Sequence, residues 1–148
     1  MRIEIYADVQ THAKQPPERV KVSLTEKPAG NFWKCENPNN PEQWHLAQTA
    51  DLKNIEPVFI LTDQAKDPEG RAIESLVYQA LYIYHLDPAR VLRAVVIMSN
   101  PKLIQKHSDS VYFVRSSYSK PAYTVTRGSC SCQDHKAGNV CKHRIAAA

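Results

Sequence analysis

Residues 130–143 read CSCQDHKAGNVCKH, in which a C-x-C pair is followed, eight residues later, by C-x-H. Three of the four cysteines of this 148-residue chain lie in the stretch. Zinc prefers four thiolate or imidazole ligands at the corners of a tetrahedron, and two close pairs joined by a polar loop can supply them. The sequence therefore predicts a zinc site with three cysteines and one histidine as ligands: Cys130, Cys132, Cys141 and His143.

Four protein ligands leave no open coordination position, so we expect one zinc ion with a structural role. Structural zinc contributes about 10–16 kcal/mol to folding in finger-sized peptides. Other interpretations stay open. His135 lies inside the loop and could replace His143 as ligand, and a disulfide between Cys130 and Cys132 would close a very small, strained ring. The clustering could also be chance. The fourth cysteine, Cys35, is predicted to be a core residue.

The segments around the predicted zinc site indicate a small fold. Residues 111–115 and 121–127 alternate as two strands, which predicts a β-hairpin ending near Gly128. The polar, glycine-containing residues 133–140 predict a surface loop between the two ligand pairs. Residues 140–148, rich in alanine, predict a short helix. A unit of this size needs a metal to hold it together.

The N-terminal 62 residues have the pattern of a small antiparallel sheet. Residues 1–9 alternate, with Ile3 and Ile5 on one face and charged residues on the other, as a half-buried strand does. The same kind of pattern predicts four further strands, bounded by turn residues, at residues 20–24, 31–36, 43–48 and 55–62.

Helical periodicity follows the sheet. Asp67-Pro68-Glu69 combines an N-cap, a proline at the first helical position and an acid in the first turn, and the apolar spacing then predicts a helix to about Leu86. Asp87-Pro88 repeats the signal and predicts a second helix to about Met98. A third piece is expected to begin after Asn100-Pro101, over residues 102–107.

Together these patterns predict the fold class α+β: a small antiparallel sheet followed by two or three helices, then a zinc-clipped β-hairpin plus a short helix. We expect two domains, an α+β domain over residues 1–98 and a zinc-binding module over residues 99–148. The latter is called the C-terminal module below.

The charge is unevenly distributed along the chain. Residues 1–98 carry 11 Lys+Arg and 13 Asp+Glu, a net charge of −2, whereas residues 99–148 carry 8 and 2, a net charge of +6. A basic module on a mildly acidic body favours a polyanionic partner. The composition shows no membrane segment and no signal peptide, so we expect no membrane partner and a cytoplasmic location, or a nuclear one in a eukaryote.

Residues Val111 to His143 resemble the SWIM zinc finger family. The similarity lies in an aromatic-Val-Arg-Ser-Ser first strand, a Tyr-Thr-Val second strand, Cys-Ser-Cys and Cys-Lys-His. It covers about residues 99–148, and the first 98 residues carry no such resemblance. The chain departs from the family pattern after His143, where the last helix usually continues with further apolar residues. The resemblance implies zinc binding together with DNA binding or protein–protein contact.

On this basis we expect a non-enzymatic accessory protein that binds nucleic acid, DNA in particular, through the C-terminal module. Exposed cations can bind phosphates and a tyrosine can stack on an unpaired base. The predicted contact residues are Arg115, Tyr118, Lys120, Arg127, Lys136, Lys142 and Arg144.

Two other functions remain open. The first is a protein–protein interaction adaptor in a complex that acts on DNA, such as a recombination, transposition or defence complex. The second is a metal-dependent nuclease built on Asp63, Asp67 and Glu69. No catalytic motif supports an enzyme, and these three acids are explained more simply as the cap of a helix.

Overall fold

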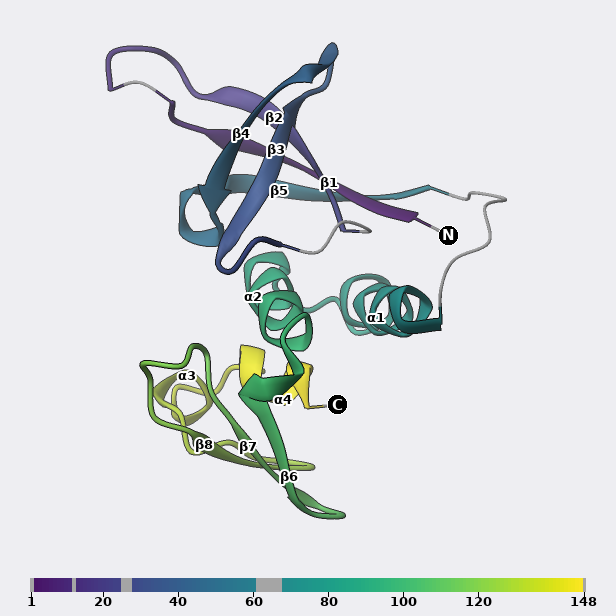
Figure 1. Cartoon of the computed structure of the whole chain (residues 1–148), viewed down its shortest axis with the longest axis vertical. Coiled ribbons are helices and arrows are strands. Elements are labelled where there is room, and N and C mark those ends of the chain that lie inside the picture. The colour runs from purple at the N-terminus through teal and green to yellow at the C-terminus, as the bar shows by residue number, and fades with distance from the viewer. Residues whose placement is uncertain (1, 12, 25–27, 61–67, 148) are drawn as a thin grey trace.

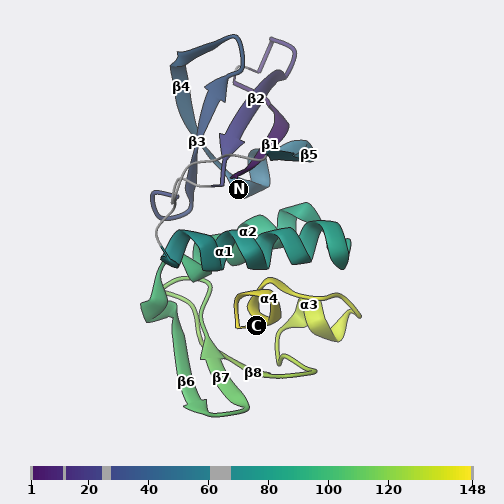
Figure 2. The ribbon, with the colours of Figure 1, turned by 90° about the vertical axis from the view of Figure 1, so that its right-hand side faces the viewer.

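The computed structural model describes residues 2–11, 13–24, 28–60 and 68–147. Three layers are stacked along the long axis of the molecule, with a five-stranded sheet at one end, two helices in the middle and the C-terminal module at the other end (Figure 1, Figure 2). Sheets and helices occupy separate stretches of the chain, so the predicted α+β class is confirmed.

The first sheet is antiparallel and has the strand order β4-β3-β2-β1-β5. Its inner face carries the alternating apolar residues, among them Ile3, Ile5, Trp33 and Cys35, which are almost fully buried. The predicted strands are therefore present, with bounds shifted by a few residues. They are β1 (Arg2–Val9), β2 (Glu18–Ser23), β3 (Phe32–Asn37), β4 (Asn40–Gln48) and β5 (Lys53–Ile60), with a short 3₁₀ turn at Thr49–Asp51 after β4.

Two helices pack beneath this sheet. Helix α1 (Pro68–Tyr78) continues into a π-helical turn, η2 (Gln79–Ile83), and helix α2 (Pro88–Met98) follows. The carboxylate of Asp87 caps α2 by accepting a hydrogen bond from the Arg90 N–H at 3.1 Å, as its sequence predicts. The predicted cap of α1, Asp67, lies outside the described residues. No helix in the described part of the chain is long and apolar enough to cross a membrane.

Helix α2 is buried on two faces. Its residues Val91, Leu92, Ala94, Val95 and Ile97 are all almost fully buried, which is more than one amphipathic stripe requires. The reason is its position between the first sheet and the C-terminal module (Figure 2). Each buried Val, Leu or Ile side chain contributes roughly 1.5–3 kcal/mol, so α2 joins the two ends of the molecule through its packing.

The C-terminal module contains the predicted hairpin and one strand more. A single 3₁₀ turn (Pro101–Leu103) leads into β6 (Ile104–Ser108), which pairs with β7 (Val111–Val114), and β7 pairs with β8 (Tyr123–Thr126). The third helical piece expected over residues 102–107 is therefore mostly a strand. Ser108 pairs with Val111 and Ile104 with Val114, so β6 and β7 form a hairpin that turns at Asp109-Ser110.

Two short helices complete the C-terminal module. Helix α3 (Gln133–Lys136) lies inside the stretch expected to be a loop, and helix α4 (Lys142–Ala146) is the predicted final helix. Helix α4 packs against α2, and its residues Ile145 and Ala146 belong to the core. The domain boundary at residue 98 remains a prediction.

Candidate metal centre

The three thiols and the imidazole of the C-x-C…C-x-H stretch meet at one point in the structure. One ligand atom from each of Cys130, Cys132, Cys141 and His143 lies within 4.8 Å of all the others. The side chains are 4%, 3%, 0% and 4% exposed, in that order. A tetrahedral zinc with Zn–S bonds of about 2.3 Å holds its sulfurs about 3.8 Å apart. The four ligand atoms therefore need to move only slightly closer together to bind a single metal ion.

The first ligand pair is held by the turn that follows β8. Cys130 pairs with Val125 across an isolated bridge, so the chain folds back on the strand that it has just left. Ser131 fixes the return, because its N–H donates to the Thr124 carbonyl at 3.1 Å and its hydroxyl accepts from the Thr124 N–H at 3.0 Å. This double link turns the sulfurs on either side of Ser131 towards the interior.

Each of the two short helices starts at a ligand. Cys132 is the N-cap of α3, and its sulfur accepts a hydrogen bond from the His135 N–H at 3.4 Å. Cys141 is the N-cap of α4, and His143 lies in the first turn of that helix. The C-x-H spacing therefore places a thiol and an imidazole side by side at one helix end.

The loop between the ligand pairs is fastened to α2. Asp134 in α3 accepts two hydrogen bonds from the Arg90 guanidinium, at 2.8 and 2.9 Å, and a third from the Asn139 side chain at 2.9 Å. Arg90 in turn contacts Asp87, the cap of its own helix. Because Asp134 follows Cys132 by two residues, this bidentate pair sets the position of the metal cluster relative to the middle layer.

Burial makes the cluster unfavourable for bare charges. It raises the pKa of the Cys130 thiol to about 12 and also raises the pKa of Cys141. Burial acts in the same direction on Cys132, but hydrogen bonds from the His135 N–H and from Cys130 outweigh it and lower the pKa of Cys132. A bound cation removes the desolvation penalty by replacing the thiol protons, so the donor set suits a metal.

His143 provides the strongest test of this fit. Both of its ring nitrogens are buried and have no hydrogen-bond partner among the described residues. Buried polar atoms are rarely left unpaired, and a metal would satisfy one of these two nitrogens. Burial, followed by the charge of Lys142, lowers the pKa of His143 to about 4, so its imidazole is neutral and able to ligate. The Tyr123 ring packs against it at a centroid distance of 4.8 Å.

The alternatives left open by the sequence can now be placed. His135 does not belong to the four-ligand group, although its own backbone N–H supports Cys132. Cys35 lies in the first sheet, fully buried, which confirms its prediction as a core residue, and burial raises its pKa to about 11. Of the acids considered for a nuclease, Asp63 and Asp67 lie outside the described residues, as does the side chain of Glu69.

The residues predicted to contact nucleic acid do not form a single cluster. Lys120 and Lys142 line one pocket, and Arg127 and Arg144 line another on a different side of α4. Tyr118 is 64% exposed at the tip of the loop between β7 and β8, where its hydroxyl meets the Asn100 side chain at 3.0 Å. The other two predicted contacts, Arg115 and Lys136, are exposed.

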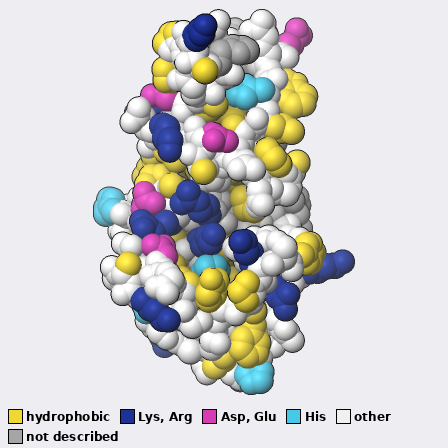
Figure 3. Space-filling model, turned by 90° about the vertical axis from the view of Figure 1, so that its left-hand side faces the viewer, with side chains coloured by type: hydrophobic (Ala, Val, Ile, Leu, Met, Phe, Trp, Pro, Cys, Tyr) yellow, Lys and Arg dark blue, Asp and Glu magenta, His cyan; other side chains and the backbone are white. Residues whose placement is uncertain are grey.

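One further basic residue, Arg93, lies beside the predicted contact residues. Arg93 of α2 lines the same pocket as Lys120 and Lys142. Figure 3 shows Lys and Arg side chains gathered on one face over the middle of the molecule. A charge count split at residue 98 assigns Arg93 to the acidic part of the chain, and only the packing of α4 on α2 brings the two parts together. The position of Arg93 in the sequence, three residues after Arg90, does not indicate that it lies beside Lys120 and Lys142.

Comparisons of this chain with protein-family models, with curated proteins and with solved structures find no match. The metal-binding assignment therefore rests on the geometry of the four side chains.

Proposed function

We propose that this chain is a zinc-binding accessory protein with a SWIM-like finger that binds nucleic acid, DNA in particular, through its C-terminal module. The buried Cys₃His group is the observation that carries the proposal. Its four ligands fill a tetrahedral shell, which fits a structural zinc and gives no role to a bound water. In this proposal the protein is not an enzyme.

The charge of the C-terminal module supports nucleic acid as the partner. Its net charge of +6 changes to about +5 when three thiolates bind one Zn²⁺, because −3 + 2 = −1. Exposed lysines and arginines at this density attract phosphates, and counterion release then makes the affinity depend on salt. The exposed Tyr118 ring is suited to stacking on an unpaired base.

Two measurements on the purified chain test this function. Elemental analysis should find one zinc per chain, retained through gel filtration. Fluorescence anisotropy with labelled single- and double-stranded DNA, from 50 to 300 mM salt, should show an affinity that falls linearly on a log–log plot. The proposal is wrong if the zinc-loaded chain has no measurable affinity at low salt, or an affinity without a salt slope.

A protein-interaction adaptor is the second candidate, and one observation favours it. On the outer face of the first sheet Phe32, Trp44 and Leu46 are 42%, 54% and 50% exposed. The Lys34 ammonium lies over the Trp44 ring, 5.1 Å from its centroid. Exposed apolar clusters are typical of interaction surfaces. A partner that stays bound after nuclease treatment, and is lost in Trp44→Ser with DNA affinity unchanged, would favour the adaptor.

A further inference from the structure

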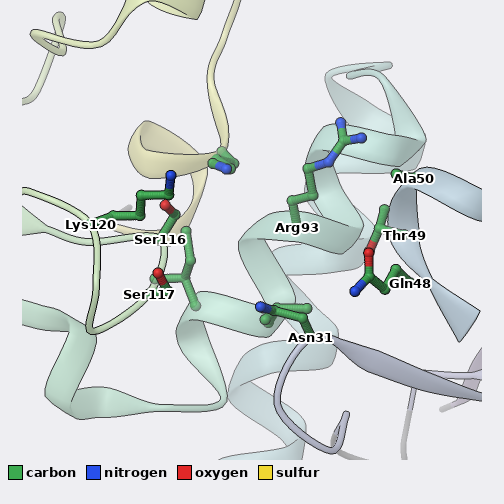
Figure 4. Close-up of a pocket in the computed structure, with 11 residues that line it drawn as sticks. Asn31, Gln48, Thr49, Ala50, Arg93, Ser116, Ser117 and Lys120 are labelled. Atoms are coloured by element: carbon green, nitrogen blue, oxygen red, sulfur yellow. The ribbon is translucent and has the colours of Figure 1, made fainter. Parts of the chain in front are cut away.

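A pocket of about 250 Å³ lies where the three layers of the molecule meet. Figure 4 shows the loop after β7 on one side of it, with Ser116, Ser117 and Lys120, and α2 with Arg93 on the other. Asn31, before β3, and Gln48, Thr49 and Ala50, after β4, close the end that faces the first sheet. Lys142 of α4 and two apolar residues of α2 complete the lining, which is Asn31, Gln48, Thr49, Ala50, Arg93, Val96, Ile97, Ser116, Ser117, Lys120 and Lys142.

The charged side chains that line this pocket are all basic. They are Arg93, Lys120 and Lys142, and no acidic residue among those that the structure describes joins them. None of these three cations forms an ion pair with a carboxylate in the part of the chain that the structure describes. The charge of Asp134 acts on both Arg93 and Lys142, but this carboxylate is bound by Arg90 and does not line the pocket. Cations that gather in a hollow without a counter-charge favour an anionic ligand.

The remaining polar groups are suited to donating hydrogen bonds to an oxyanion. The Thr49 hydroxyl accepts a hydrogen bond from the Trp33 indole N–H at 3.0 Å, so its own proton is free to be donated into the pocket. Ser116 and the amides of Asn31 and Gln48 add further donors. The Arg93 guanidinium can bind two oxygens of one phosphate at once, which a lysine cannot do.

We propose that this pocket binds a phosphate group. The inference rests on the proposed function for the source of that group, a phosphate of the nucleic-acid backbone. Arg93 is the principal ligand, with Lys120 and Lys142 as flanking charges and hydroxyls of Thr49 and Ser116 as orienting donors.

The pocket needs both ends of the chain. Lys142 lies between the ligands Cys141 and His143, and Ser116 and Lys120 belong to the loop before β8, whereas Thr49 follows the last strand of the β1–β4 meander. Helix α4 packs against α2, so a phosphate in the pocket would fix the N-terminal sheet relative to the nucleic acid. The first 98 residues thereby acquire a part in binding.

The first test uses inorganic phosphate as the probe and the zinc-loaded full chain. Phosphate is titrated at constant ionic strength with chloride as the balancing anion, and backbone amide shifts are followed by NMR. We expect saturable shifts at Asn31, Thr49 and Ser117, weakened at least about tenfold in Arg93→Gln, since a charged hydrogen-bonding group is lost. Lys53→Gln, an exposed lysine on β5 outside the pocket, is the control and should bind as the unchanged chain does. The proposed phosphate site is wrong if the unchanged chain shows no saturable shifts, or if Arg93→Gln binds phosphate as tightly as the unchanged chain does.

A second variant guards against misfolding. Lys120 is exposed in a loop, so Lys120→Gln should leave the fold and the zinc content intact while weakening phosphate binding. If Arg93→Gln fails to fold, Lys120→Gln decides: full zinc together with full phosphate affinity in Lys120→Gln shows that the proposal is wrong.

The second test separates the pocket from the proposed function. Loss of one phosphate contact should reduce the slope of log affinity against log salt by about 0.9 for duplex DNA or about 0.7 for a single strand. Arg93→Gln should show that reduction and Lys53→Gln should not. Phosphate binding without any DNA binding would leave the pocket in place and overturn its nucleic-acid assignment. DNA binding with an equal slope in both variants would overturn the same assignment while leaving the proposed function intact.

Discussion

Replacing Cys141 with serine tests the four-ligand assignment directly. Cys141 is fully buried at the start of α4, and its sulfur is one of the four atoms that meet within 4.8 Å. A hydroxyl is a poor zinc ligand, so Cys141→Ser leaves three ligands and a buried polar group. If about 10–16 kcal/mol of zinc binding is shared by four ligands, one ligand accounts for about 2.5–4 kcal/mol. The expected loss of zinc affinity is therefore about 60- to 700-fold.

The chain supplies a matched control for this substitution. Cys35 is also fully buried, but it lies in the first sheet, where its thiol donates a weak hydrogen bond to the Trp33 carbonyl at 3.5 Å. Cys35→Ser places the same hydroxyl in an equally buried site and costs about 1–3 kcal/mol of stability. Because Cys35 is remote from the cluster, the variant should keep one zinc per chain.

Zinc content and affinity are measured by elemental analysis and by competition with a chromogenic chelator, alongside circular dichroism to follow unfolding. Cys141→Ser should lose zinc at chelator concentrations that leave Cys35→Ser loaded. Wild-type zinc affinity in Cys141→Ser would refute the assignment, as would zinc loss in Cys35→Ser with its fold intact.

Three further predictions concern stability. Burial disfavours the charged form of His143 and lowers its pKa from 6.5 to about 4, so its contribution to folding stability is present above pH 6.5 and is lost as the pH falls towards 4. Zinc retention against a chelator, measured at stepped pH, should fall over that window. Arg90→Met removes the bidentate contact to Asp134, and because both side chains are partly exposed we expect it to lower the free energy of unfolding by about 1 kcal/mol. The Tm should fall and zinc release should be faster, and no change in either would contradict the linking role of Arg90. Trp33→Phe deletes the buried hydrogen bond to Thr49 and should lower the free energy of unfolding in urea by about 1–3 kcal/mol, with the zinc content unchanged. A change near zero would show that water replaces the indole N–H as the partner of Thr49.

The parts of the fold that depend on local spacing could be predicted from the sequence. The alternation around Ile3 and Ile5 and the cap at Asp87 depend on neighbours in sequence, and the structure has both features. The two ligand pairs belong to the same class, because the members of each pair, Cys130 with Cys132 and Cys141 with His143, are two residues apart. For these features, short-range chemistry decides the geometry.

Contacts with other elements account for what the sequence could not show. Residues 104–108 have no strong strand pattern, and they become a strand because β7 offers an edge to pair with. Asp134 lies in a polar stretch that looks like a loop, yet Arg90 from another layer holds it in a helix. Arg93 enters the basic pocket only because α4 packs on α2. Arg90 and Asp134 are 44 residues apart in the chain, so no short stretch of sequence shows that contact.

The start points of α3 and α4 have a consequence for the order of folding. Helices of four and five residues are far below the roughly 12–15 residues at which an isolated helix becomes marginally stable, because forming the first turn is costly. Both helices begin at a cysteine of the cluster, so a bound metal fixes the first turn of each and removes that cost. The ion is then the nucleus of this part of the chain. We expect the sheet and α2 to form first and the end of the chain to fold at a rate set by the free zinc concentration.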